Sequence, residues 1–140
     1  IYLMGGDDPS SPSLLNTLLH FGSESLGGLP AWLAAWLMLL GQSIFNFFVT
    51  SGSGQAALTM PIMAPMSDLL GVTRQVAVLA FQLGDGFTNL LVPTSAALMA
   101  CLGAARLDWL NWVRAVLGLV AGLMLIASIF VILAVLTGFQ

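Results

Sequence analysis

Two short polar stretches, at residues 51–55 and 84–95, interrupt a mostly apolar sequence and hold the side chains that could do chemistry. Their hydroxyls and amides are neutral hydrogen-bonding groups, and their glycines let backbone approach a ligand closely. Such groups suit a site that binds a small molecule and releases it in every cycle. The candidate binding residues are Ser51, Gly52, Ser53, Gly54, Gln55, Asp85, Thr88, Asn89, Thr94 and Ser95.

Asp85 is the one acidic residue inside an apolar region of the sequence. A buried carboxylate is costly unless it is paired, protonated or bound to a cation. We therefore consider three functions for Asp85: a proton site, a cation ligand, or a partner for a substrate amine. The alternative is a structural bond to local backbone donors or to an arginine elsewhere. Gly84 and Gly86 flank Asp85, which predicts that a helix unwinds there.

Other reactive side chains are scarce in this sequence. Cys101 and His20 are each the single residue of their type. Cys101 lies in an apolar run and is expected to be a small buried side chain. The sequence offers no Ser/His, paired-Asp or metal-ligand set. We therefore expect no enzyme, no catalytic residues, no bound metal and no cofactor.

The composition indicates an all-α integral membrane protein. Hydrophobic residues make up 59% of the chain and charged residues only 6%, whereas soluble domains carry about 25% charged residues. The three basic residues are all arginines and the net charge is −3. A nucleic-acid partner is excluded because phosphate binding needs a basic surface. The expected partner of the apolar surface is the lipid bilayer.

The first membrane element is predicted to be a re-entrant helical hairpin over residues 31–67. Residues 31–49 form an apolar helix, which carries Gln42, Ser43 and Asn46 on a face expected to point into protein or a cavity. The second limb, residues 56–66, is about 12 residues long and too short to cross a bilayer comfortably.

The tip of this hairpin is predicted at residues 51–55. The second limb also contains Pro61 and Pro65, which disfavour a long helix. This arrangement places Ala31 and Ser67 on the same side of the membrane.

A broken transmembrane helix is predicted over residues 75–103, with the interruption at the second polar stretch. Residues 106–114 should form an interfacial elbow anchored by Trp109 and Trp112, and residues 113–137 a final transmembrane helix.

The two ends of the sequence complete the predicted domain plan. Arg106 and Arg114 would be cytoplasmic by the positive-inside rule, with the C-terminus and the hairpin base outside. Residues 1–30 are predicted to be a polar segment that contains an interfacial amphipathic helix at 14–21.

Two interrupted apolar elements are typical of secondary transporters. In such proteins discontinuous helices meet near the membrane midplane, where half-helix N-termini face anions and freed carbonyls hold cations. The polar stretches at 51–55 and 84–95 are therefore expected to approach each other there.

The residues of these stretches also carry a family resemblance, which runs from about residue 14 to the end. Residues 46–48 and 51–61 resemble the hairpin of the YfcC family, and residues 71–75, 84–89 and 93–95 resemble its following loop and broken helix. Members of that family are C4-dicarboxylate anaerobic carriers, related to arginine/ornithine antiporters. The family resembles the ion transporter superfamily, whose members have two inverted repeats. The resemblance implies that this chain holds one repeat's hairpin and broken helix and the last span.

The resemblance implies a secondary active transporter of small carboxylates, namely C4-dicarboxylates, or of amino acids. Transport would be by exchange or coupled to an ion, sodium or a proton. The implied protein is a multi-pass protein of the bacterial inner membrane. Its implied partners are the other, N-terminal half of the transporter and a second copy in a homodimer. The alternative is a non-transporting membrane subunit, or degenerate fragment, that packs against partner helices.

Overall fold

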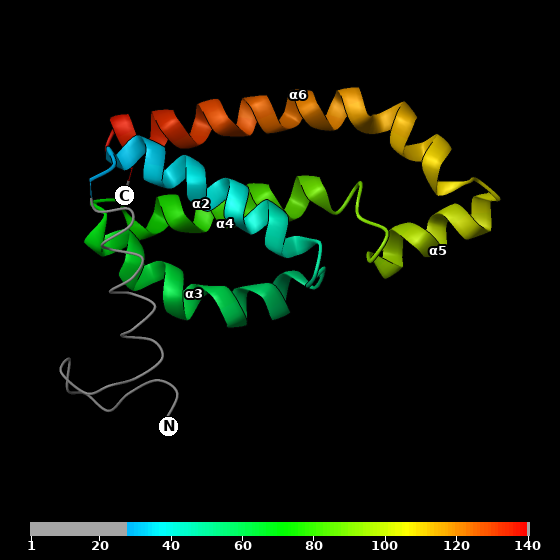
Figure 1. Cartoon of the computed structure of the whole chain (residues 1–140), viewed down its shortest axis with the longest axis horizontal. Helices are drawn as coiled ribbons and strands as arrows, with labels where there is room; N and C mark the ends of the chain where they lie inside the picture. The colour runs from blue at the N-terminus through cyan, green and yellow to red at the C-terminus, as the bar shows by residue number, and fades with distance from the viewer. Residues whose placement is uncertain (1–27, 140) are drawn as a thin grey trace.

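The computed structural model describes residues 28–139. Within this range it contains five helices and no strand: α2 (Ala31–Asn46), α3 (Gly52–Leu69), α4 (Arg74–Thr88), α5 (Ala96–Ala105) and α6 (Trp109–Leu136) (Figure 1). The predicted all-helical class is confirmed for this range. The amphipathic helix predicted at residues 14–21 lies outside the described residues.

Helices α2 and α3 form an antiparallel hairpin, which ends beside the loop that follows α4 (Figure 1). Ala34 near the start of α2 and Met66 near the end of α3 line one groove, so the two ends of the hairpin lie together. The insertion of this hairpin into one side of a membrane stays a prediction.

The tip of the hairpin differs from the predicted one. Ser51 caps α3, with its Oγ accepting a hydrogen bond from the Gly54 N–H at 3.3 Å, and the helix begins at Gly52. The turn therefore comes before residues 51–55 and not within them. Glycines near the start of a helix give the sequence pattern of a break. Here the serine cap accepts a hydrogen bond from an N–H group that the first turn leaves unpaired, so the helix can begin at these glycines.

The second limb is longer than the sequence predicted. Helix α3 has 18 residues and continues through Pro61 and Pro65, a length of roughly 27 Å at 1.5 Å per residue. Each proline removes one hydrogen bond from the helix. In apolar surroundings, ending the helix would leave several backbone groups unpaired instead of one.

Helix α4 runs without interruption through Gly84, Asp85 and Gly86 to Thr88. The prediction that the helix unwinds at Asp85 was therefore wrong, and the break lies at residues 89–95. Gly84 is buried against α2, where a Cβ at this position would lie 3.1 Å from the Leu39 carbonyl oxygen. This close packing outweighs the weak helix propensity of glycine, about 1 kcal/mol below alanine.

Helices α5 and α6 are separated by a short elbow. Arg106 ends α5 in a left-handed conformation with φ of 54°, and α6 begins at Trp109 after Asp108. The final helix thus starts four residues before the predicted 113. Among the described residues, α6 is the one helix that is long and apolar enough to cross a membrane.

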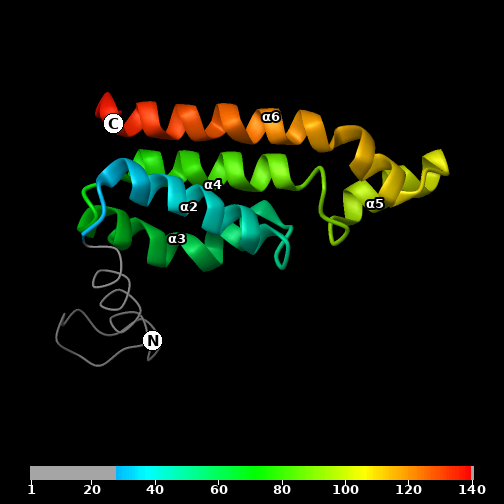
Figure 2. The ribbon, with the colours of Figure 1, turned by 45° about the horizontal axis from the view of Figure 1, so that its top comes forward.

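The core lies where α2, α4 and α6 pack side by side (Figure 2). Its buried side chains are mostly small or β-branched, and include Ala34, Ala35, Leu39, Val76, Ala77, Ala80, Ala127 and Val131. Small residues let helices approach closely, as is common in membrane interfaces. The indole of Trp36 adds a hydrogen bond to Ser128 Oγ at 3.1 Å.

Polar contacts join the base of the hairpin to the start of α4 and to the C-terminal end of α6. Arg74 binds Asp68 at 2.6 Å, and its hydrogen bonds hold the pKa of the exposed Asp68 carboxyl below its usual value. Thr73 Oγ1 donates to the Phe139 carbonyl at 2.7 Å. The hairpin base and the end of α6 therefore lie at the same end of the molecule.

Candidate functional site

The turn of the hairpin and the break between α4 and α5 are joined by two hydrogen bonds. Thr94 Oγ1 donates to the Phe47 carbonyl at 2.8 Å, and Thr50 Oγ1 donates to the Thr94 carbonyl at 3.3 Å. Phe47 and Thr50 belong to the turn, and Thr94 belongs to the break. We call this meeting point the tip–break junction: residues 46–53 with residues 85–94.

The carboxylate of Asp85 lies beside the first turn of α3. A Cβ built at Gly52 would be 3.0 Å from Asp85 Oδ2, so any larger residue at position 52 would displace the carboxylate. The first-turn N–H groups of a helix and the positive end of its dipole favour a negative charge at this place. The structure thus places the side chain of Asp85 beside the start of α3.

A small hydrogen-bond network fixes the end of α4. Asn89 Nδ2 donates to Asp85 Oδ1 at 3.0 Å, and Thr88 Oγ1 donates to the Gly84 carbonyl at 2.5 Å. Asn46 of α2 donates from Nδ2 to the Asp85 carbonyl at 3.1 Å and to Thr88 Oγ1 at 2.7 Å. The network therefore links the last residue of α2 to the last turn of α4.

Asn46 is a site residue that the sequence analysis did not include. It is fully buried, and both of its amide hydrogens are used on α4. The available signal was the polar face of α2, since Gln42 and Asn46 are one helical turn apart. That face was predicted to point into protein, and it does, but its contact with Asp85 and Thr88 depends on how α2 packs on α4.

Three buried amide oxygens accept no hydrogen bond within residues 28–139. They are Asn46 Oδ1, Gln55 Oε1 and Asn89 Oδ1. Buried acceptors are usually paired, and an unpaired one costs free energy. Two of the three belong to Asn46 and Asn89, whose amide nitrogens donate to the backbone carbonyl and to the carboxylate of Asp85, respectively.

Seven of the ten predicted binding residues lie at the tip–break junction, and three lie beside it or away from it. Gly54 follows the junction in the first turn of α3. Gln55 is buried and donates from Nε2 to the carbonyl and side-chain oxygens of Gln42, at 3.0 and 2.7 Å. Ser95 directly follows the junction and lines a hollow with Asn89 and Trp112.

Two tryptophans of α6 bind the break directly. Trp109 Nε1 donates to the Leu91 carbonyl and Trp112 Nε1 donates to the Leu90 carbonyl, both at 3.0 Å. These residues were predicted to be anchors at the membrane interface, and their contact with the break was not predicted. Their spacing of three residues places both indoles on one face of α6, where they donate to carbonyls of the break.

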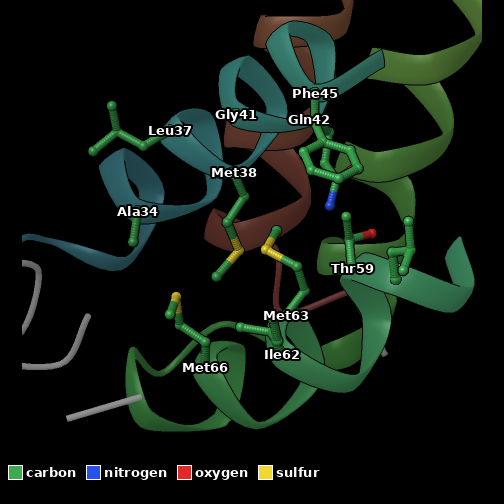
Figure 3. A pocket seen from close by; sticks show the side chains of 11 residues that line it. Ala34, Leu37, Met38, Gly41, Gln42, Phe45, Thr59, Ile62, Met63 and Met66 are labelled. Atoms are coloured by element: carbon green, nitrogen blue, oxygen red, sulfur yellow. The ribbon is translucent and has the colours of Figure 1, made fainter. Parts of the chain in front are cut away.

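A groove of about 530 Å³ lies between the two limbs of the hairpin. Met38, Met63 and Met66 converge in it, and Gln42 and Thr59 are its polar side chains (Figure 3). With so few polar groups, this hairpin groove offers packing surface and little chemistry.

The described residues contain no group of three His, Cys, Asp or Glu side chains that could hold a metal ion. Cys101, predicted to be buried, is exposed on α5. Helix α5 has one buried residue, Leu102, because it extends beyond the core of α2, α4 and α6 (Figure 2).

Comparison with known proteins places this chain in a family. Residues 2–136 match the model of the C4-dicarboxylate anaerobic carrier family. The chain is 52% identical over its whole length to the "putative basic amino acid antiporter YfcC" of Escherichia coli (strain K12). It is 33% identical over 124 residues, or 86% of its length, to an uncharacterized protein of Haemophilus influenzae.

The chain spans 28% of the Escherichia coli protein and 23% of the Haemophilus influenzae protein. No solved structure matches it. The similarity also includes residues 2–12, which precede the motifs that carry the predicted resemblance. Because the family's pattern covers nearly the whole sequence, the chain belongs to the C4-dicarboxylate anaerobic carrier family, within the YfcC group.

Proposed function

We propose that this chain is part of a secondary transporter and that its tip–break junction binds the substrate. Family membership favours a carrier over an enzyme. The observation that carries the proposal is the contact of two interrupted helical elements through Thr50 and Thr94, with Asp85 beside Gly52. Junctions of discontinuous helices are where secondary transporters bind substrate.

In this proposal the chain is embedded in the membrane along the direction of α6. Helix α6 is 28 residues long, or roughly 42 Å, enough to cross the hydrocarbon core. Helices α4 and α5 with their break form a second crossing. The α2–α3 hairpin enters from the side of the Asp68–Arg74 pair and returns to it. Its tip then lies at the depth of the break, which supports a site near the midplane.

The junction has the chemistry of a reversible site. Apart from the carboxylate of Asp85, its polar groups are neutral and include the hydroxyls of Ser51 and Ser53, the amide of Asn89 and the first N–H groups of α3. Neutral donors hold a small carboxylate without the cost of separating an ion pair at release. The family description names C4-dicarboxylates and the Escherichia coli relative's name refers to basic amino acids. We propose a small carboxylate of one of these classes, moved by exchange or with sodium or a proton.

The test is counterflow by the complete protein in lipid vesicles, with C4-dicarboxylates and amino acids as substrates. Thr94→Val removes the bond from the break to the hairpin turn. It should lower transport roughly fivefold or more, the ratio that about 1 kcal/mol gives. Thr137→Val is the matched control, because Thr137 Oγ1 bonds carbonyls of its own helix.

Two results would contradict the proposal in different ways. If the wild-type protein exchanged none of these substrates, the alternative of a membrane subunit that only packs against partner helices would be favoured. If Thr94→Val and Thr137→Val transported equally well, the carrier would remain but its site would not be the junction.

A further inference from the structure

We propose that the segment of residues 14–21 docks on the base end of the hairpin groove and bridges α2 and α3 there. The occupant is thus a segment of this same chain that precedes the described residues. The base end of the groove is lined by Ala34, Leu37, Met38, Met63 and Met66. Three observations carry the inference, which does not depend on the substrate: the polarity of the groove, the sparse packing of α3, and the pattern and reach of the segment.

The groove between α2 and α3 has an apolar base end and a more polar tip end. Figure 3 shows Ala34, Leu37 and Met66 at one end of the groove, and Gln42 and Thr59 toward the other. Methionine side chains are unbranched and adapt their shape to an apolar partner. The base end therefore offers a surface that aliphatic side chains of another helix can enter.

Helix α3 is sparsely packed on the other described residues. Of its 18 residues, Gln55 and Ser67 are buried, and both are polar. Ile62, Met63 and Met66 line the groove and are only partly buried. A further apolar element in the groove would cover these side chains and remove their surface from water.

The base end of the groove lies close to the polar boundary of the membrane. Asp68 comes two residues after Met66, roughly 3 Å further along α3, and it pairs with Arg74. The two charged side chains are 48% and 64% exposed, so in the proposed membrane orientation they belong at the level of the headgroups. An apolar hollow at this level suits an amphipathic helix in the plane of the interface better than a lipid tail.

The proposed segment has the sequence pattern of such a helix. Leu14, Leu18 and Phe21 recur at positions i, i+4 and i+7, which places them on one face. Asn16 and His20 fall on the opposite face of the same helix. Amphipathic helices that lie in apolar grooves use anchors at this spacing, so the apolar face fits the groove while the polar face stays at the membrane surface.

The segment is close enough in sequence to reach the base end. Residues 22–30 join it to α2, and a connection of this length spans at most roughly 30 Å. Helix α2 begins at Ala31, about one turn before Ala34 in the groove. The connection therefore keeps the segment at a high effective concentration near the groove. A second copy of the protein has no such linkage.

The experiment is cysteine crosslinking of the complete protein in lipid vesicles, in a background where Cys101 and any other native cysteine are replaced by serine. Leu18→Cys paired with Met66→Cys should form a disulfide under mild oxidation. Leu18→Cys paired with Leu58→Cys is the matched control, because position 58 lies on the same groove but roughly 12 Å nearer the tip. Asn16→Cys paired with Met66→Cys tests the face of the segment. The first pair should crosslink roughly tenfold faster than either control.

Protection of the groove gives a second measurement. In the same background, a single cysteine at position 66 should react slowly with a membrane-impermeant maleimide added from the outside. Leu18→Glu should raise this labelling rate roughly tenfold, because a charge cannot enter the apolar groove without a large cost. Asn16→Glu, on the polar face, should leave the rate unchanged. Thermal unfolding in detergent checks each variant, and the crosslinking rates decide the question if Leu18→Glu fails to fold.

Several results would overturn the proposal. Absence of the disulfide between positions 18 and 66, or equal rates for all three pairs, would show that the segment does not dock at the base end. Disulfides between differently tagged copies, and not within one copy, would assign the groove to a second protein molecule. Photocrosslinking of the base end to a diazirine-labelled phospholipid, with position 66 unprotected by the segment, would assign it to lipid.

Discussion

The residues around Asp85 show how one residue type serves different purposes within three positions. Gly84 lies against α2, where a Cβ would also be 3.1 Å from Ser43 Oγ and 3.2 Å from Gln42 Cβ. Gly86 has open space, with nothing within 4 Å of a Cβ. Gly84 therefore permits the close approach of two helices, whereas Gly86 does not. Asp85 between them is held in place by this packing and by Asn46.

A substitution at these two glycines should separate the roles. Gly84→Ala should destabilise the protein by about 1–3 kcal/mol, because the new methyl group meets backbone and side chain of α2. Gly86→Ala should stabilise it slightly, by up to about 1 kcal/mol, through helix propensity. Thermal unfolding of both variants in the same detergent measures the difference. Equal melting temperatures would show that Gly84 is not a close-packing position.

At the scale of the helices, the break between α4 and α5 is supported from outside. Thr94 joins it to the hairpin turn, and the indoles of Trp109 and Trp112 bind its Leu91 and Leu90 carbonyls. Irregular backbone within a membrane is tolerated only where protein or water satisfies its polar groups. The first residues of α6 thus supply the hydrogen bonds that stabilise the irregular backbone of the break.

Replacing the indoles should loosen the break without removing aromatic packing. Trp109→Phe and Trp112→Phe should each cost about 1 kcal/mol, the net value of one hydrogen bond. Hydrogen exchange of the amides in residues 89–95 should become faster in both variants. Trp32→Phe is the control, because Trp32 is exposed at the far end of α2. Unchanged exchange in both α6 variants would mean that the break is held by Thr94 and local bonds.

At the scale of the molecule, the base of the hairpin and the elbow between α5 and α6 lie at opposite ends. The bond from Thr73 to the Phe139 carbonyl places the hairpin base at the C-terminal end of α6. The elbow with Arg106 lies at the opposite end (Figure 1). The hairpin begins and ends at the same end of the molecule, whereas α6 runs from one end to the other. This arrangement predicts a re-entrant hairpin, with the end that carries Arg106 in the cytoplasm.

Cysteine labelling tests this topology directly. In a Cys101→Ser background, single cysteines at Gly28, Leu69 and Ala105 all fall at exposed positions. A membrane-impermeant maleimide should label positions 28 and 69 from the same side, the outside, and position 105 from the opposite side. If positions 28 and 69 were labelled from opposite sides, α2 and α3 would not form a re-entrant hairpin.

The sequence by itself determined the class of protein, its helical elements and its two polar stretches. Composition decides these features, since so few charges cannot cover a water-facing surface, and Ser51, Asp85 and Thr94 stand out in apolar runs. The tertiary structure decided where the helices end. Gly84, Gly86, Pro61 and Pro65 are residues that locally favour a break, but all four lie inside continuous helices.

Only the tertiary structure also decided which side chains complete the junction. Asn46 reaches Asp85 across 39 positions, and Trp109 reaches the break across 18. Contacts of this kind depend on the angle and register of packed helices, which side-chain size sets at sites such as Gly84. The meeting of the two polar stretches could therefore be predicted, because interrupted helices of transporters approach each other. The residues of α2 and α6 that contact these stretches could not be predicted.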